Sequence, residues 1–490
     1  MFETAETGAS IGKEEYERRI PELRVELVNA QYDLREADFP VIVVVCGDDW
    51  LGVHEILTAV GEIMDGRFVA LHAMGEASDE EGERPEFWRY WRRLPGAGEM
   101  AVFADEWSAD ALVRYLRERV DREGYERQLR RIARFEADLA QGGALVLKFW
   151  IHVPKKALKK RIKKAKKNRR MAWRIGAESQ ELYDGYTQVM EAARRLVEVT
   201  DEAESPWHLV EGSDRRTLRL SVFETLFAAL RARLDRAPPE PPPPAAAPSQ
   251  EPGNSSILHT VDLGARLERE EYKKRLAAGQ TRLFELGEKA QKKGVTTALV
   301  FEGWDAAGKG GVIRRITRAT DVRRTRVVAV GAPSPEEAAH HYLWRFWRQL
   351  PRKGHMVIFD RSWYGRVLVE RVEGYAGEAE WRRAYREIND FEEQLTEAGM
   401  VVQKFWLHID PAEQLARFRA REQTSYKKYK ITEDDYRNRG KWAGYEQAVE
   451  EMVARTSTSH APWHLIPANH KPYARVQVIE TICAALEDRL

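Results

Sequence analysis

The sequence predicts an α/β protein made of two tandem copies of one domain, each a mainly parallel sheet between helices. Two observations lead to this fold class. Strand-length apolar segments alternate with amphipathic helical segments, an order typical of a parallel sheet covered on both faces. The chain also repeats itself, since a shift of 256 positions, from Gly47 to Gly303, aligns its two halves without a gap.

The repeat is clearest in its aromatic motifs. Residues 88–91 (WRYW) align with 344–347 (WRFW), and 206–209 (PWHL) align with 462–465 (PWHL). A period this long indicates the duplication of a whole domain rather than a solenoid of short repeats.

A proline-rich segment separates the two copies. Residues 237–252 read APPEPPPPAAAPSQEP, in which eight of sixteen residues are proline. Such a run favours extended polyproline conformation and cannot form a core. It could also serve as an SH3-type ligand, but its position midway between two folded halves favours a linker. We therefore place the domains at 1–236 and 257–490, with a linker at 237–256.

Both copies show the same elements in the same order. A charged amphipathic helix, at 14–36 and at 268–293, leads into an apolar segment typical of a buried strand. A glycine turn and a helix follow, then alternating strands and helices, a long charged helical region, and a last short strand with a final helix. The predicted strands are 40–46, 67–73, 100–104 and 144–151 in the first copy and 296–302, 326–330, 356–360 and 401–409 in the second. The predicted helices among them are 86–93 and 121–141, and 336–350 and 377–397.

The composition is that of a globular protein. Hydrophobic residues make up 43% and charged residues 32% of 490 residues, too many residues for one ordinary domain. The balance of 79 Lys+Arg against 78 Asp+Glu gives no sign of a polyanion partner, although it would not reveal a local basic patch. Two cysteines in apolar segments exclude a disulfide scaffold and favour a reducing cytoplasm. No signal-peptide core or membrane-spanning run is present, so we expect no membrane partner.

A phosphate-binding loop follows the first strand of the second copy. Residues 303–309 read GWDAAGK, which matches G-x-x-x-x-G-K between an apolar strand and a helix. The glycines let backbone N–H groups turn toward phosphate oxygens, and the helix N-terminus adds partial positive charge. The alternative, a turn with chance glycines, is disfavoured because strand, glycines, lysine and helix all stand in order. The predicted phosphate-binding residues are Gly303, Ala306, Ala307, Gly308, Lys309 and Gly310.

Two aspartates are predicted to bind Mg²⁺, the expected cofactor. Gly310 replaces the Ser or Thr that usually follows the lysine and holds the ion. Asp305, inside the loop, is then the nearest hard oxygen donor. The strand at 356–360 ends in Asp360, where a phosphate-loop enzyme places its second magnesium carboxylate.

Basic residues follow at two places. Arg361, Arg366 and Arg371 come after the strand-end aspartate, and arginine suits forked contact with phosphate oxygens. Surface salt bridges are the alternative, but the position favours a phosphate role for Arg361 and Arg366. The region 417–441 is helical in composition and dense in charge, so it is either a lid that supplies cations or a solvated helix face; spacing alone slightly favours the latter.

Together these motifs resemble the polyphosphate kinase 2 family. They are GWDAAGKGG at 303–311, FDRSWYGR at 359–366, KKYKITEDD at 427–435 and APWHLIPANHK at 461–471. The resemblance extends over nearly all of 257–490, and the first two motifs in combination are highly specific. The tandem arrangement resembles the two-domain subgroup, whose members are polyphosphate:AMP phosphotransferases.

The resemblance implies tandem P-loop kinase-like domains with a helical lid. It also implies magnesium-dependent transfer of the terminal phosphoryl group of polyphosphate to AMP, giving ADP, in the second copy. The implied catalytic residues are Asp305, Lys309, Asp360, Arg361, Arg366 and Arg421, and the lid adds Lys427 and Lys430 for phosphate binding.

The phosphate motifs leave the acceptor open. Polyphosphate-driven phosphorylation of ADP, GDP or a broader set of nucleotides is an alternative, and a homo-oligomer is compatible with the sequence. A non-catalytic polyanion-binding protein is disfavoured by the intact Lys309, Asp305 and Asp360, and an ordinary ATP-dependent kinase by Asp305 and Gly310. Nucleic acid is not expected as a partner, because no helix-turn-helix, zinc or RNA-binding motif is found.

The first copy lacks the phosphate chemistry. Val53 stands where the second copy has Lys309, and Ala104 stands where it has Asp360. Losing a cation and a carboxylate removes several kcal/mol of transition-state stabilisation, so we predict that this copy is inactive. It also carries eleven basic residues in the sixteen of 155–170, which form either a solvated basic helix or a track for polyphosphate.

Overall fold

The computed structural model describes residues 1–167, 183–236, 256–423 and 433–490. The chain forms two compact units. Unit 1 consists of Met1–Ala77, Arg89–Pro239 and Ser334–His341, and unit 2 of Ser78–Trp88, Glu240–Pro333 and Tyr342–Leu490. The linker predicted at 237–256 lies outside the described residues except for Ser256. None of the helices in the described ranges has the length and hydropathy needed to cross a bilayer.

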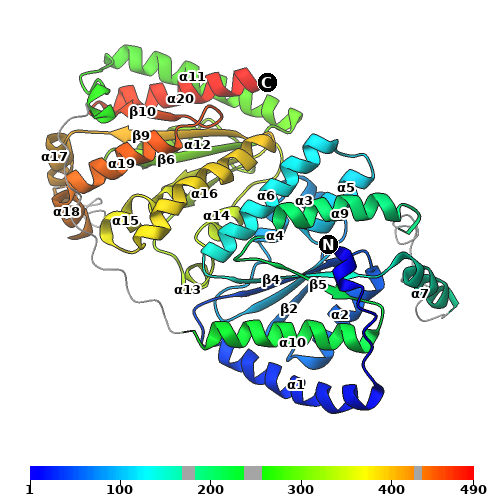
Figure 1. Ribbon diagram of the computed structural model, residues 1–490. Coiled ribbons are helices and arrows are strands. Elements are labelled where there is room, and N and C mark those ends of the chain that lie inside the picture. Colours follow the sequence, from blue (N-terminus) through cyan, green and yellow to red (C-terminus); the bar gives the residue numbers. More distant parts are fainter. Residues whose placement is uncertain (168–182, 237–255, 424–432) are drawn as a thin grey trace. The chain divides into compact units, whose positions relative to one another are not determined.

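Unit 1 contains a parallel sheet with the strand order β2-β3-β1-β4-β5. Helices α1 and α10 cover one face, and α6 and α9 cover the other (Figure 1). The central strand β1 is buried along nearly its whole length, because strands flank it and helices cover both faces. The strands are β1 Val41–Gly47, β2 Val69–Ala73, β3 Met100–Ala104, β4 Leu145–His152 and β5 Trp207–Glu211. The helices along residues 1–236 are η1 Phe2–Ala5, α1 Lys13–Leu34, α2 Trp50–Ile63, α3 Asp79–Gly82, α4 Trp88–Trp91, α5 Trp107–Leu116, α6 Arg122–Gln141, α7 Lys155–Lys167, α9 Tyr186–Thr200 and α10 Arg215–Leu234.

Unit 2 repeats this arrangement with the order β10-β9-β6-β8-β7, again parallel throughout. Helices α11 and α20 cover one face of its sheet, and α16 and α19 cover the other (Figure 1). The strands are β6 Thr297–Gly303, β7 Thr325–Ala329, β8 Met356–Asp360, β9 Val401–His408 and β10 Trp463–Pro467. The helices along residues 256–490 are η3 Ile257–Thr260, α11 Arg269–Lys293, α12 Lys309–Thr317, α13 Pro335–Ala338, α14 Trp344–Trp347, η4 Trp363–Arg366, α15 Val369–Glu373, α16 Glu378–Glu397, α17 Pro411–Glu422, α18 Glu433–Gly440, α19 Trp442–Thr456 and α20 Lys471–Arg489.

The predicted fold class, two tandem α/β domains with parallel sheets, is confirmed. The prediction of a single helix at 336–350 is wrong, because the structure has the one-turn helices α13 and α14 with a turn between them. The rings of Trp344, Phe346 and Trp347 are all buried in this segment. Their individual packing, rather than helix continuity, determines its path. The predicted helix at 86–93 likewise shrinks to α4.

A fully buried lysine occupies the same place in both units. In unit 1, Lys148 on β4 pairs with Glu136 on α6 at 2.6 Å, and both side chains are inaccessible to solvent. In unit 2, Lys404 on β9 pairs with Glu392 on α16 at 2.7 Å with the same burial. Each glutamate also accepts a hydrogen bond from a buried tryptophan. A buried charge is tolerated only with such partners, so this network is part of the fold rather than of a reactive site.

Candidate active site

The loop between β6 and α12 has the backbone geometry of a phosphate cradle. Gly303, Ala306 and Gly308 adopt φ angles of 145°, 63° and 116°, which turn the chain back on itself before the helix begins. A Cβ atom on Gly303 would lie 2.6 Å from the carbonyl oxygen of Leu407 on the neighbouring strand. Only glycine fits there, because β6 passes directly beside the β9 backbone.

Lys309 is the first residue of α12 and lies against this loop. Its Nζ donates to the carbonyl oxygen of Gly303 at 2.6 Å and to that of Trp304 at 3.4 Å. Burial lowers the pKa of Lys309, and the neighbouring Asp305 carboxylate opposes the shift. An ammonium held at the mouth of the loop is placed to contact phosphate oxygens bound by the loop amides.

Arg417 holds the loop from behind. Its guanidinium donates to the carbonyl oxygens of Ala306 and Ala307 at 2.9 and 2.8 Å, and to those of Ala468 and Asn469 at 2.7 and 2.9 Å. The side chain is only 6% exposed. These donors are engaged by the protein, so this arginine, on the basic region 417–441, supports the loop rather than offering a free cation.

The two predicted magnesium carboxylates lie at the carboxyl ends of neighbouring parallel strands, Asp305 in the loop after β6 and Asp360 at the end of β8. Asp305 contacts the Arg361 guanidinium at 3.2 Å and the Asn438 side-chain amide at 3.2 Å. Asp360 ends β8, where the strand register pairs it with Phe301 on β6. No hydrogen bond or ion pair from the described residues engages the Asp360 carboxylate. Mg²⁺ commonly takes one or two carboxylates together with phosphate oxygens and water, so this pair fits that ion.

A cavity of about 660 Å³ opens in front of the loop. It is lined by the residues Trp304–Gly311, by Asp360, and by cations from three helices and the turn after β8. Burial and the neighbouring Arg417 lower the pKa of Lys471 to about 8. Such an excess of cations around two carboxylates suits a polyanion. The cationic lining residues are Lys309, Arg314, Arg361, Arg417, Arg421, Lys471 and Arg475.

The other predicted site residues fall into three groups. Arg421 lies at the cavity, as its lining shows. Arg366 is not brought there: its guanidinium pairs with Glu370 at 3.1 Å and with Glu380 at 3.6 Å. Lys427 and Lys430 lie outside the described residues.

A second, more apolar cavity of about 100 Å³ adjoins the first. Trp304, Asp305 and Arg361 line both cavities. In the second, the ring of Trp304 stacks on that of Trp442, with centroids 3.7 Å apart and an angle of 11° between the planes. Leu368, Val369, Trp406 and Tyr445 complete its apolar wall. An aromatic, partly apolar pocket beside a cation-rich one suits a ligand with a planar ring and a charged group.

His408 fixes Trp304 from below the loop. The Trp304 indole N–H donates to His408 Nδ1 at 3.1 Å. Burial lowers the pKa of His408 to about 4, so its ring is neutral near pH 7 and can accept this hydrogen bond.

Sequence reasoning missed several of these residues. Lys471 and Arg475 stand one turn apart at the start of the last helix, far along the chain from the loop. Lys471 ends the family motif at 461–471, to which no phosphate role was assigned, and the spacing of Lys471 and Arg475 on one helix face was a second signal. Trp442 carried no signal, because one tryptophan among 15 gives no indication of its stacking partner.

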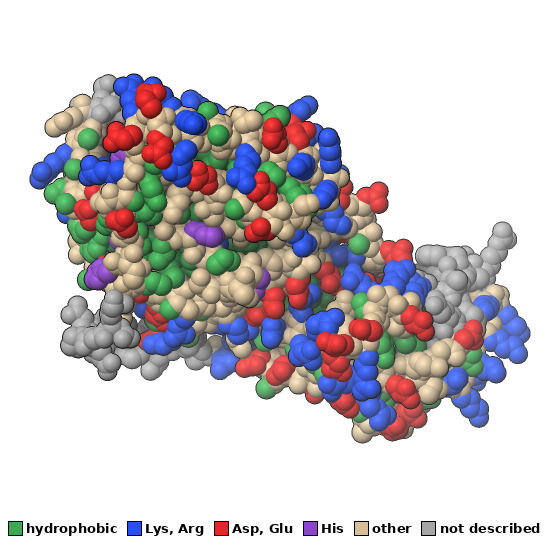
Figure 2. All heavy atoms as spheres, turned by 90° about the horizontal axis from the view of Figure 1, so that it is seen from above, with side chains coloured by type: hydrophobic (Ala, Val, Ile, Leu, Met, Phe, Trp, Pro, Cys, Tyr) green, Lys and Arg blue, Asp and Glu red, His purple; other side chains and the backbone are tan. Residues whose placement is uncertain are grey.

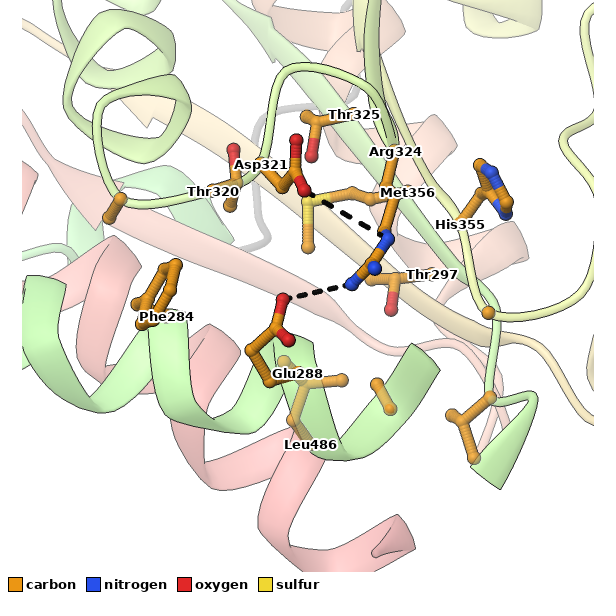
Figure 3. A pocket seen from close by; sticks show the side chains of 15 residues that line it. Phe284, Glu288, Thr297, Thr320, Asp321, Arg324, Thr325, His355, Met356 and Leu486 are labelled. Atoms are coloured by element: carbon orange, nitrogen blue, oxygen red, sulfur yellow. Dashed lines mark hydrogen bonds and ion pairs between the residues drawn. The ribbon is translucent and has the colours of Figure 1, made fainter. Parts of the chain in front are cut away.

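Another pocket of unit 2 lies among the amino-terminal ends of its strands, at the opposite edge of the sheet from the loop (Figure 3). Figure 3 shows Glu288 and Asp321 turned toward Arg324, which they contact at 2.9 and 3.9 Å. Its volume is about 30 Å³, room for a water molecule but not for a nucleotide. We therefore interpret the contacts of Arg324 with Glu288 and Asp321 as structural ion pairs and not as a ligand site.

The corresponding loop of unit 1 has a different conformation. Helix α2 begins at Trp50, the equivalent of Ala306, so the residues that form the cradle in unit 2 form a helical turn in unit 1. Neither Trp50 nor Gly52, the equivalent of Gly308, has a positive φ angle. Val53, at the position of Lys309, is buried in the core.

The aspartate shared by the two loops is also used differently. In unit 1, Asp49 is fully buried and pairs with Arg161 at 2.5 Å. Burial raises the pKa of Asp49 to about 6, against the opposing effect of Arg161. Arg161 is the equivalent of Arg417, and it also donates to the carbonyl oxygen of Gly212 at 2.6 Å. Arg417 therefore supports the open loop of unit 2, whereas its equivalent Arg161 pairs with the loop carboxylate of unit 1.

The comparisons with known proteins agree with this geometry. The family model described as Polyphosphate kinase 2 matches residues 10–238 and 266–490. The chain is 44% identical over 491 residues to the Polyphosphate:AMP phosphotransferase of Pseudomonas aeruginosa, covering 99% of each. It is 34% identical over 481 residues to the protein of that name from Acinetobacter johnsonii, covering 95% of this chain and 96% of that one.

A solved structure matches the whole fold. The crystal structure of a polyphosphate kinase 2 from Pseudomonas aeruginosa PA01 superposes with a TM-score of 0.90 at 42% sequence identity, covering 100% of this chain and 99% of that one. Both halves match one family, and the relatives share the two-copy build over their full length. The chain therefore belongs to the polyphosphate kinase 2 family, in its two-domain group.

Proposed function

We propose that this protein transfers the terminal phosphoryl group of inorganic polyphosphate to AMP, giving ADP, and that the reaction takes place in unit 2 with Mg²⁺. The observation that carries the proposal is the junction of the two cavities at Asp305 and Arg361. One side suits a polyanionic donor and the other a nucleoside. The names of the full-length relatives support polyphosphate and AMP as the pair.

The donor chain lies in the cation-rich cavity. Loop amides and Lys309 hold its terminal phosphates, and Lys471 and Arg475 on α20 add charge on the same side. These cations are fixed before the substrate arrives, so they stabilise developing charge without reorganisation.

The acceptor enters from the aromatic cavity. Its base lies near the stacked Trp304 and Trp442, and its phosphate points toward Arg361, which lines both cavities. A phosphate oxygen is already ionised near pH 7, so attack on the donor needs position and charge neutralisation rather than a general base. Arg361 is well placed for both tasks, because the Asp305 carboxylate orients its guanidinium.

Asp305 and Asp360 would hold Mg²⁺, which when bound supplies positive charge to the phosphate oxygens. Asp305 already has two contacts that fix its orientation, to Arg361 and to Asn438. Asp360 is free of such contacts among the described residues and faces the same cavity.

We also infer that the working domain is 257–490 and that the domain at 1–236 is inactive. Val53 and Ala104 remove the cation and the carboxylate, and α2 fills the place of the cradle. The remaining aspartate, Asp49, is paired internally with Arg161 through one of its carboxylate oxygens.

The test is product analysis with separate acceptors. Purified protein is incubated with Mg²⁺ and polyphosphate plus AMP, ADP, GMP or GDP, and the nucleotides are separated. We expect ADP from AMP as the main product. Rapid ATP or GTP formation from the diphosphates, with AMP left unreacted, would show that the acceptor is a nucleoside diphosphate and not AMP.

A matched pair of variants tests the site. Lys309→Met should abolish turnover, while Lys353→Met, an exposed lysine of the same unit, should leave it unchanged. Full turnover in Lys309→Met would overturn the assignment of the phosphate loop.

A further inference from the structure

Helix α7 of unit 1 presents a continuous face of exposed lysines. No acidic residue occurs between Lys155 and Lys167. Figure 2 shows Lys and Arg side chains gathered at the right-hand edge, where α7 lies. With Lys166 set aside, these lysines form no ion pair with the residues that the structure describes. The exposed lysines are Lys155, Lys156, Lys159, Lys160, Lys163, Lys164, Lys166 and Lys167.

The opposite face of α7 anchors the helix. Leu158 and Ile162 are buried against Val153 and the two tyrosines Tyr183 and Tyr186. Arg161, on the same side, binds the buried Asp49. Lys155 also lies over the rings of both tyrosines, whereas the other lysines are exposed and are not part of this apolar cluster. Because the apolar face is already covered by protein, the helix has no free face to insert into a lipid surface.

The equivalent helix of unit 2 provides an internal comparison. Helix α17 keeps the inward arginine, Arg417 in place of Arg161, and keeps a buried apolar residue, Phe418 in place of Ile162. The charged residues of α17 are three arginines and two glutamates, whereas every charged residue of α7 is a cation. Lysines one turn apart repel one another, so the charged face of α7 weakens its own helix unless an anion neutralises it.

We propose that the lysine face of α7 binds inorganic polyphosphate at a site of its own, in the unit that has lost the phosphate loop. The choice of ligand rests on the proposed function, in which polyphosphate is the donor. Lysine is a point-charge phosphate binder, and α7 offers such charges along about 20 Å. A chain held there stays tethered to the protein, which raises the effective concentration of donor for the active site.

Nucleic acid fits this surface less well. Among its residues Lys155–Lys167, α7 carries no aromatic side chain on which a base could stack and no Asn or Gln that could read a base edge. Polyphosphate needs neither, because every unit of the chain is a phosphate.

The first measurement is polyphosphate affinity against salt concentration. The test variant replaces Lys156, Lys160, Lys163 and Lys164 by Gln, and long-chain polyphosphate is titrated into the full-length protein. The control replaces the exposed lysines 273, 274, 289 and 292 of α11 by Gln, the same change of charge on another helix. We expect the slope of log affinity against log salt to fall by about 3, and affinity at physiological salt to fall at least about tenfold, only in the test variant. An unchanged slope, or an equal loss in the control, would overturn the proposal.

Chain length and ligand type sharpen the result. The KM for long-chain polyphosphate should rise in the test variant, while kcat and the KM for tripolyphosphate should stay the same. A single-stranded oligonucleotide of matched charge should bind the wild-type protein more weakly than polyphosphate. Equal binding, with an equal loss in the variant, would make the surface a nucleic-acid site and overturn the proposal.

The binding assay also separates this inference from the proposed function. It is run in a Lys309→Ala background, where no phosphoryl transfer is needed. Lysine-dependent binding without AMP phosphorylation by the wild-type protein would refute the proposed function alone. AMP phosphorylation with lysine-independent binding would refute this inference alone. Equal unfolding temperatures of the test and control variants exclude misfolding as the cause of a loss.

Discussion

The same stretch of chain forms an open loop in unit 2 and a helical turn in unit 1. In unit 2, left-handed backbone at Ala306 and Gly308 delays the start of α12 until Lys309. In unit 1, α2 begins at Trp50 and continues through Gly52. A cradle of this kind depends on a few strained positions, which persist only where surrounding contacts hold them. Without them, the ordinary helical geometry returns.

The rest of the fold is similar in the two units. Both units keep the same strand order and the same buried lysine network. Arg361 and its counterpart Asp105 even share positive φ angles, 67° and 53°, although one is a cation at the cavity and the other is not. The backbone frame is therefore separable from the chemistry, which a small number of side chains decides.

The largest expected effect comes from the aspartate that both loops share. Asp305→Asn should lower kcat for AMP phosphorylation by at least about 1,000-fold, because it removes a fixed carboxylate beside the reacting phosphates. Its counterpart Asp49→Asn should leave kcat unchanged. It should instead lower the stability of unit 1 by about 1 kcal/mol, because Arg161 loses this partner but keeps its hydrogen bond to Gly212. Steady-state kinetics and hydrogen exchange measure the two effects, and equal kinetic losses in both variants would contradict the comparison.

The buried lysines should respond alike in the two units. Lys148→Met and Lys404→Met each leave a buried glutamate without its cationic partner, which costs about 3 kcal/mol or more of folding free energy. Hydrogen exchange resolved by unit should show each loss in its own unit. A clear catalytic loss in folded Lys404→Met protein would mean that this network belongs to the active site.

The pKa values of the equivalent histidines His408 and His152 should be shifted in opposite directions. Burial lowers the pKa of His408 to about 4, below about 6.5 for an unfolded chain. The folded state then binds fewer protons, so unit 2 should lose about 2 kcal/mol of stability between pH 7 and pH 5.

Burial is the largest single influence on His152 and lowers its pKa, but the hydrogen bonds and the charges of Asp48 and Glu6 together outweigh burial and raise it. Its contribution to stability is present below about pH 6.5 and is lost as the pH rises through the raised pKa. NMR titration of wild-type, His408→Gln and His152→Gln proteins checks both signs. Similar titration midpoints for the two histidines would contradict this difference.

The smallest effect is expected at the aromatic cavity. Trp442→Ala removes the ring stacked on Trp304 and should raise the KM for AMP about tenfold, with a smaller change in kcat. Tyr186 occupies the equivalent position in unit 1, so Tyr186→Ala serves as the control and should not change the KM. If both substitutions raise the KM for AMP, the acceptor does not bind where we propose.

Much of this molecule was predictable from the sequence, because the informative signals were local. Strand hydrophobicity, the 256-residue repeat and the GWDAAGK loop each lie within a short stretch or a fixed offset. Asp305 was predicted as a magnesium ligand because Gly310 replaces the usual Ser or Thr, and Asp360 because it ends an apolar strand.

The remainder depends on contacts between distant residues. Arg417 reaches the loop carbonyls across about a hundred positions, and composition alone could not separate it from Arg421, which lines the cavity. The pairing of Arg366 with Glu370 and Glu380 was equally invisible, since arginine after a strand suits phosphate and carboxylate alike. The helical turn at Trp50 forms where the positive φ angles of the unit 2 cradle are absent. Residue types alone do not show whether a loop adopts such angles.

The central claim is that two copies of one fold contain a single working site, in unit 2. The most direct test is the rate of ADP formation from AMP and polyphosphate in full-length protein that carries Lys309→Ala. We predict a residual rate below about one thousandth of the wild-type rate, because the only intact phosphate loop among the described residues is disabled. A residual rate near half that of the wild type would show that unit 1 also works, and would contradict the account.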